Sequence, residues 1–164
     1  MICTKGGQGY GVGSTWSRGA AWALYGFILS YIHTGEQRYL DTAKKVAHYF
    51  IVNLENSDWK ALCDFRSPEE PVYYDSSAAA IAACGMIEIA KAVPEFEKDI
   101  YLNAAIKTLK ALDKDFCCYD ESDDAIVQWG TVMYTAAQNR NLVYADYFYT
   151  EALLKLKGSE FLPW

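Results

Sequence analysis

The chain has 164 residues, 52% of them hydrophobic and 15% aromatic, so it can bury one compact core and is too short for two ordinary domains. Its formal net charge of −6 repels phosphate backbones and anionic lipid surfaces, which argues against nucleic acid and membrane partners. We therefore expect residues 1–164 to form a single domain, in which an anionic ligand would need a locally placed Arg or Lys.

Cysteine usage indicates the compartment. The cysteines are odd in number and lack Cys-x-x-Cys spacing, and two are adjacent, a poor geometry for a disulfide. This usage predicts a reducing, cytoplasmic environment. The first residues do not resemble a signal peptide, and no stretch reaches the ~18 apolar residues of a membrane span, so we expect a soluble protein. The five cysteines are Cys3, Cys63, Cys84, Cys117 and Cys118.

Five segments carry apolar residues at helical spacing. Ser14 is the expected N-cap of the first, and Asp75 or Ser76 that of the third, whose many small residues predict close packing on both sides. Gly35 is the expected stop of the first helix, and Tyr101 is expected on the wetter face of the fourth. The predicted helices cover residues 14–33, 36–54, 76–93, 95–116 and 142–157.

Two longer segments lack helical periodicity. Residues 55–73 contain two prolines and predict a long loop, and residues 119–141 predict a loop with a short hairpin around 125–134. Helices separated alternately by short turns and long loops are typical of paired helices in layers. The sequence therefore predicts an all-α fold that forms part of a helical toroid.

The segment from Gln8 to Trp22 is the richest in chemistry, because a glycine-rich approach leads into a helix that begins with tryptophans and an arginine. Indole faces stack on sugar rings, and a guanidinium binds a carboxylate with two hydrogen bonds. On one continuous helix, Trp16 and Trp22 would lie about 120° apart and Arg18 about 200° from Trp16, so the three would not share a narrow stripe. The alternative interpretation places both tryptophans in the core and Arg18 at the surface or at a cap.

Other types of site are weakly indicated. The glycines lack the Lys of a phosphate-binding loop, and His33 and His48 have no third metal ligand nearby, so a hydrogen-bonded structural role is the default for them. Carboxylates are plentiful, but nothing in the sequence selects an acid/base pair. Asp146 lies among aromatic residues, where a hydrogen-bonded anchor is favoured over catalysis.

Four blocks together resemble, in order and spacing, the C-terminal half of the unsaturated glucuronyl hydrolases, family 88 of the glycoside hydrolases. The blocks are QGYGVGSTWSRGAAWALYGF, HTGEQRYLDTAKKVAHYF, YDSSAAAIAACGMIEIAKAVPEF and YADYFYTEALLKL. The element Trp-x-Arg-Gly-x-x-Trp is also found, in looser form, in unsaturated rhamnogalacturonyl hydrolases. The resemblance implies an (α/α)6 barrel, of which this chain would supply the C-terminal half with five to six helices.

The resemblance also implies a reaction. Enzymes of this family remove the 4,5-unsaturated uronic acid that polysaccharide lyases leave at the non-reducing end of oligosaccharides such as glycosaminoglycan fragments. An aspartic acid protonates the vinyl ether, water adds, and the hemiketal opens without a metal or organic cofactor. Carried over by position, Gln8, Trp16, Arg18 and Trp22 would line the sugar pocket, with the tryptophans as stacking platforms and Arg18 as the main polar contact.

Several departures from the family pattern modify this expectation. The two essential aspartates of the family precede the glycine-rich segment and are not found in this sequence, and Ala20, Trp129 and Gly130 stand where the family usually has Gln or Asn and a His-Gly pair. We expect no catalytic residue in this chain and no turnover by the chain alone. Exposed apolar flanks of half a barrel would favour a homodimer or association with an N-terminal half. The alternatives are a non-catalytic carbohydrate-binding or assembly module and a helical scaffold unrelated to sugar.

Overall fold

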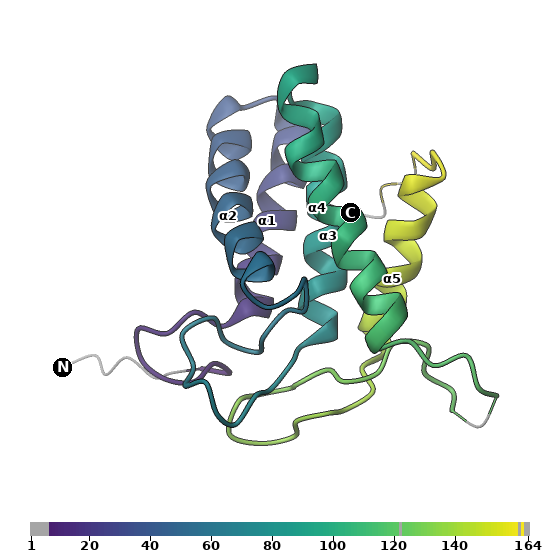
Figure 1. Ribbon diagram of the computed structural model, residues 1–164. Helices are drawn as coiled ribbons and strands as arrows, with labels where there is room; N and C mark the ends of the chain where they lie inside the picture. Colours follow the sequence, from purple (N-terminus) through teal and green to yellow (C-terminus); the bar gives the residue numbers. More distant parts are fainter. Residues whose placement is uncertain (1–6, 122, 161, 163–164) are drawn as a thin grey trace.

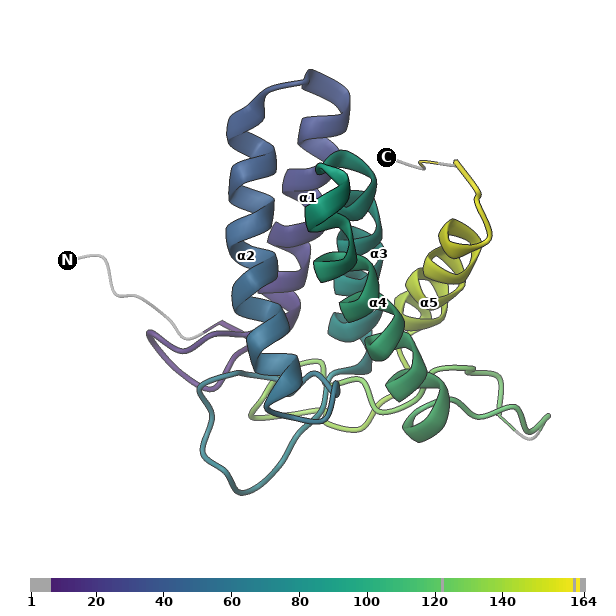
Figure 2. The same ribbon diagram turned by 45° about the horizontal axis from the view of Figure 1, so that its top comes forward.

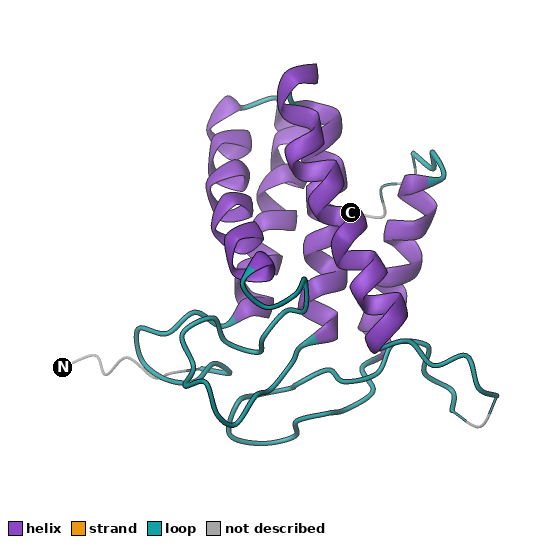
Figure 3. Ribbon diagram, in the orientation of Figure 1, coloured by secondary structure: helices purple, strands orange, loops and turns teal. Residues whose placement is uncertain are grey.

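A computed structural model describes residues 7–121, 123–160 and 162, and these form five helices and no strands (Figure 3). No helix within these ranges is long and apolar enough to cross a membrane. The predicted all-α fold and the number of helices are therefore confirmed. The helices are α1 (Ser17–Thr34), α2 (Gln37–Glu55), α3 (Ser76–Ala92), α4 (Glu95–Asp115) and α5 (Val143–Leu156).

The helices form two layers, and α3 has the central place. Helices α1, α3 and α5 lie side by side, and α2 and α4 pack on α1 and α3 (Figures 1 and 2). The turns between α1 and α2 and between α3 and α4 are short and lie at one end, whereas the long loops gather at the other (Figure 1). As a result, α1, α3 and α5 all begin at the loop end, where the glycine-rich segment also lies.

Helix α3 is the centre of the core because its small residues allow neighbours to approach on all sides. Every residue from Ser76 to Ala90 is buried. A Cβ atom at Gly85 would overlap the side chain of Leu24 and lie 3.1 Å from the Cα atom of Tyr25, so the α1–α3 contact requires glycine there. The prediction of close packing from small residues is confirmed.

The helix ends show one error of the sequence analysis. Helix α1 begins at Ser17 with Trp16 at the N-cap, so the prediction that Ser14 caps it is wrong. The hydroxyl of Ser14 instead donates to Asp64 Oδ2 at 2.6 Å, a contact with a residue 50 positions away. Gly35 ends the helix in the left-handed conformation (φ 71°), as expected, and Asp75 lies at the N-cap of α3.

Tyr101 and the predicted hairpin also differ from expectation. Tyr101 is fully buried because its ring stacks on His48 of α2 and its hydroxyl lies 2.9 Å from His48 Nε2, so its predicted place on the wetter face is wrong. The structural role expected for His48 is confirmed. Around residues 125–134 the described residues form isolated antiparallel bridges instead of strands, with Gly130 and Arg140 exchanging two backbone hydrogen bonds.

A buried charge cluster joins α3 and α5 far from the loop end. The ammonium of Lys155 lies 2.7 Å from Glu88 Oε1 and 3.2 Å from Glu151 Oε1, and the hydroxyl of Tyr25 donates to the same Glu151 oxygen. Burial alone would lower the pKa of Lys155, but the hydrogen bond to Glu88 and the charges of both glutamates raise it overall. The cluster therefore holds a charged lysine in the interior.

Candidate functional site

The glycine-rich segment is organised by one buried carboxylate. Asp64 Oδ2 accepts hydrogen bonds from the Tyr10 amide at 2.9 Å and the Ser14 hydroxyl at 2.6 Å. Asp64 Oδ1 accepts from the amides of Thr15 at 3.0 Å and Arg66 at 2.9 Å. The side chain is fully buried, so these four donors replace the hydration of the carboxylate. Asp64 therefore fixes the backbone that leads into α1.

Two glycines make room for Trp16 beside this carboxylate. A Cβ atom at Gly9 would lie 2.5 Å from Asp64 Oδ2 and 3.0 Å from Trp16 Cβ. A Cβ atom at Gly19 would lie 2.6 Å from Trp16 Cε3. The indole is thus folded back over the first turn of α1, and any larger residue at Gly19 would displace it.

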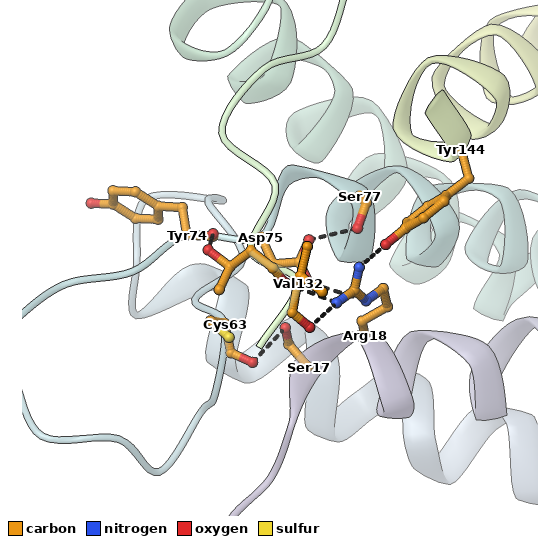
Figure 4. Close-up of polar contacts among 9 residues, drawn as sticks. Ser17, Arg18, Cys63, Tyr74, Asp75, Ser77, Val132 and Tyr144 are labelled. Carbon is orange, nitrogen blue, oxygen red and sulfur yellow. Dashed lines mark hydrogen bonds and ion pairs between the residues drawn. The ribbon is translucent and has the colours of Figure 1, made fainter. Parts of the chain in front are cut away.

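The guanidinium of Arg18 is buried where three helices and a loop meet (Figure 4). Its Nη2 donates to the carbonyl oxygens of Thr131 and Val132, both at 2.8 Å, and its Nη1 donates to the Tyr144 hydroxyl. Its Nε lies 3.4 Å from Asp75 Oδ2. The carbon of the guanidinium lies 5.1 Å from the ring of Trp16 and 5.4 Å from that of Tyr144. Arg18 therefore ties α1 to α3, to α5 and to the loop after α4.

Asp75 supplies the negative charge for this arginine. Its side chain is fully buried at the start of α3, and its Oδ1 accepts a hydrogen bond of 2.5 Å from the Ser77 hydroxyl. Burial raises the pKa of Asp75, whereas the charge of Arg18 and the hydrogen bond from Ser77 lower it in part. A buried ion pair of this kind is costly to break, because either partner alone would be an uncompensated charge.

An apolar groove opens next to Arg18, between α1 and α5. It has a volume of about 500 Å³ and is lined by Trp22, Tyr25, Gly26, Leu29, Tyr144, Tyr147 and Phe148. Trp22, one turn after Arg18, is 40% exposed and its ring centroid lies 6.5 Å from that of Tyr144. Tyr144 thus belongs both to the groove and to the contacts of Arg18, so it connects the buried guanidinium to the groove.

The fold brings three of the predicted site residues together. Trp16, Arg18 and Trp22 are linked through the Arg18–Trp16 contact and through Tyr144, although the helical wheel separated them. The wheel did not apply to Trp16 because α1 begins one residue later. The carbonyl of Gln8 accepts a hydrogen bond of 2.9 Å from the amide of Tyr134, in the loop that also supplies Thr131 and Val132. The roles of the four residues in sugar binding remain predictions.

The structure also tests the alternative interpretation, in which both tryptophans lie in the core and Arg18 lies at the surface or at a cap. Arg18 is only 3% exposed, so the interpretation of Arg18 as a surface residue is wrong. Trp22 is 40% exposed, so its interpretation as a core residue is wrong as well. Asp146 accepts a hydrogen bond of 2.6 Å from the Val127 amide, which confirms the anchor that we expected. Within the described ranges, no group of three or more His, Cys, Asp or Glu residues could hold a metal ion.

Three contributors to the site were not found by sequence reasoning. Asp75 was assigned only to a helix cap, and Tyr144 and Thr131 were given no role. Each lies between 57 and 126 residues from Arg18 along the chain. One sequence signal could have identified Asp75. An arginine that is buried at the start of a helix needs a carboxylate partner, and Asp75 was a candidate because it was expected at the start of another buried helix.

Comparisons with known proteins relate this arrangement to a family of enzymes. No family model matches the chain. The chain is 37% identical over 156 residues to the unsaturated glucuronyl hydrolase of Bacillus sp. (strain GL1), and the alignment covers 92% of this chain and 41% of that protein. A crystal structure of unsaturated glucuronyl hydrolase from Bacillus sp. GL1 superposes with a TM-score of 0.88 at 36% identity, covering 95% of this chain and 43% of that one. The chain is homologous to a segment of the unsaturated glucuronyl hydrolases.

A mutant unsaturated glucuronyl hydrolase from Streptococcus agalactiae, solved in complex with dGlcA-GalNAc6S, is also similar. It superposes with a TM-score of 0.87 at 28% identity, and the match covers 96% of this chain and 43% of that one. The five helices therefore correspond to part of the (α/α)6 barrel of the unsaturated glucuronyl hydrolases. The chain spans about two fifths of the length of these relatives (41% and 43%).

Proposed function

We propose that this chain forms one wall of the saccharide site of an unsaturated glucuronyl hydrolase and binds a 4,5-unsaturated uronic acid at the non-reducing end of an oligosaccharide. The observation that carries the proposal is the chain of contacts from Trp16 through Arg18 and Tyr144 to Trp22, of which Tyr144 and Trp22 line the apolar groove. The complex of the Streptococcus agalactiae relative with dGlcA-GalNAc6S supports this class of ligand.

Arg18 and Trp22 would recognise different parts of the ligand. Nη1 of Arg18 donates to the hydroxyl of Tyr144, and Tyr144 lines the groove, so we assign this nitrogen and this hydroxyl to the uronate carboxylate. The half-exposed indole of Trp22 offers an apolar face for the sugar ring. The N-termini of α1, α3 and α5 lie at this same end of the molecule (Figure 1), and their partial positive charges favour an anionic ligand despite the net negative charge of the chain.

Turnover requires more of the barrel. Hydration of the vinyl ether needs a proton donor, which we expect from a polypeptide equivalent to the remaining length of the relatives. Helix α5 carries exposed apolar residues suited to such an association, including Val143 at 83% and Leu154 at 48% exposure. The same surface would also form the interface of a homodimer. The oligomeric state in solution distinguishes a homodimer from a complex with the remaining part of the barrel.

Calorimetry and absorbance test the proposal together. We expect the chain alone to bind an unsaturated glucuronyl disaccharide without changing it. Addition of the complementary part of a related barrel is expected to cause loss of the double-bond absorbance. Binding without turnover in the mixture would favour the non-catalytic carbohydrate-binding module, and absence of binding in both experiments would refute the proposal.

A further inference from the structure

The guanidinium of Arg18 has an orientation that its contacts determine almost completely. Nη2 uses both of its N–H groups on the carbonyls of Thr131 and Val132, and Nε faces Asp75. Nη1 donates to the hydroxyl of Tyr144, a residue that lines the groove. Among the described residues, Asp75 is the one carboxylate in ion-pair contact with Arg18.

Asp75 is itself held by the fold. Its amide donates to the Ala61 carbonyl at 2.8 Å, its carboxylate accepts from Ser77, and the start of α3 favours a negative charge at that point. The carbonyls that bind Nη2 carry no net charge and cannot neutralise a buried guanidinium. Without the Asp75 charge, Arg18 would be an unpaired cation that gains by turning its fork toward water.

We infer that Asp75 is a positioning residue for carboxylate recognition: its charge fixes Arg18 so that Nη1 stays against the hydroxyl of Tyr144 at the wall of the groove. The choice of ligand in this inference rests on the proposed function, whereas the orientation of Arg18 does not depend on it. It predicts that loss of the Asp75 charge weakens binding of a uronate more than binding of the corresponding uncharged methyl ester.

The test uses Asp75→Asn, which keeps the size of the side chain and removes its charge. The matched control is Glu88→Gln, which neutralises another buried carboxylate of α3 that is paired with Lys155, at the far end from Arg18. Ser77→Ala keeps the charge of Asp75 but removes its 2.5 Å hydrogen bond, and it serves as a milder second variant if Asp75→Asn does not fold. The first measurement is the NMR signal of the Arg18 Nε–H group, identified by its loss in Arg18→Lys, and its exchange with solvent.

We expect at least tenfold faster exchange of the Arg18 Nε–H group in Asp75→Asn, a smaller increase in Ser77→Ala and wild-type exchange in Glu88→Gln. For an unsaturated glucuronyl disaccharide, calorimetry is expected to show at least tenfold weaker binding by Asp75→Asn, with the methyl ester affected less than threefold. Wild-type exchange and affinity in the folded variant, or equal losses for acid and ester, would overturn the inference. If the wild-type chain binds neither sugar, the proposed function fails, while the exchange rates still decide whether Asp75 orients Arg18.

Discussion

Replacing Asp64 by Asn tests how the glycine-rich segment is held. Each carboxylate oxygen of Asp64 accepts two hydrogen bonds, from Tyr10 and Ser14 on one side and from Thr15 and Arg66 on the other. An asparagine has only one oxygen, and its better orientation turns the amino group toward Tyr10 and Ser14, because the Ser14 hydroxyl can accept from it and donate to the Gly11 carbonyl. The Tyr10 amide is then left without an acceptor. At about 1–3 kcal/mol for one buried donor left without an acceptor, we expect a loss of about 1–3 kcal/mol in the free energy of unfolding.

Urea unfolding followed by circular dichroism measures this loss, and limited proteolysis reports on the segment itself. We expect Asp64→Asn to shift the unfolding midpoint downward and to speed cleavage within residues 7–15. The control is Asp41→Asn, because Asp41 is exposed and accepts one hydrogen bond from Gln37; its effect should stay within about 0.5 kcal/mol. A change equally small in Asp64→Asn, with unaltered proteolysis, would refute the role assigned to Asp64.

Three further predictions follow from burial and packing. Gly19→Ala is expected to displace the Trp16 indole, which lies 2.6 Å from the position of the new Cβ, and to change the NMR signal of its Nε–H group; an unchanged signal would contradict the packing. Burial and the charge of Glu97 raise the pKa of Tyr101 to about 12. The folded chain then retains a proton that the unfolded chain loses above pH ~10, so the unfolding midpoint should fall between pH 10 and 12, less steeply in Tyr101→Phe. Burial raises the pKa of the Cys63 thiol to about 12, so alkylation at pH 8 should modify Cys63 only after unfolding; rapid labelling of the native chain would be inconsistent with this burial.

Local sequence patterns predicted the helices well because the features that define a helix lie within a few residues of one another. The small residues of α3 indicated its central position, and Gly35 and Asp75 marked helix ends. Ser14 fitted a cap by the same local rules, yet its hydroxyl binds Asp64, 50 residues away. Tyr101 was misplaced because its periodicity gave no information about the His48 ring that covers it.

The site was predictable only in part, for a related reason. The glycine-rich segment and the tryptophan–arginine motif are contiguous in sequence, and the fold links Trp16, Arg18 and Trp22 in one cluster of contacts through Tyr144. The partners that orient Arg18 come from three other segments, and no spacing rule links them to it. Asp75 and Tyr144 therefore became visible only when the starts of α3 and α5 were placed beside α1.

The most direct test of the central claim is an NMR titration of the chain with an unsaturated glucuronyl disaccharide. The indole signal of Trp22 and the side-chain signal of Arg18 are expected to shift together and to give the same Kd. The indole signal of Trp59, which packs against Lys107 of α4, should not move. Unchanged Trp22 and Arg18 signals at saturating sugar, or shifts confined to other tryptophans, would contradict a saccharide site in this groove.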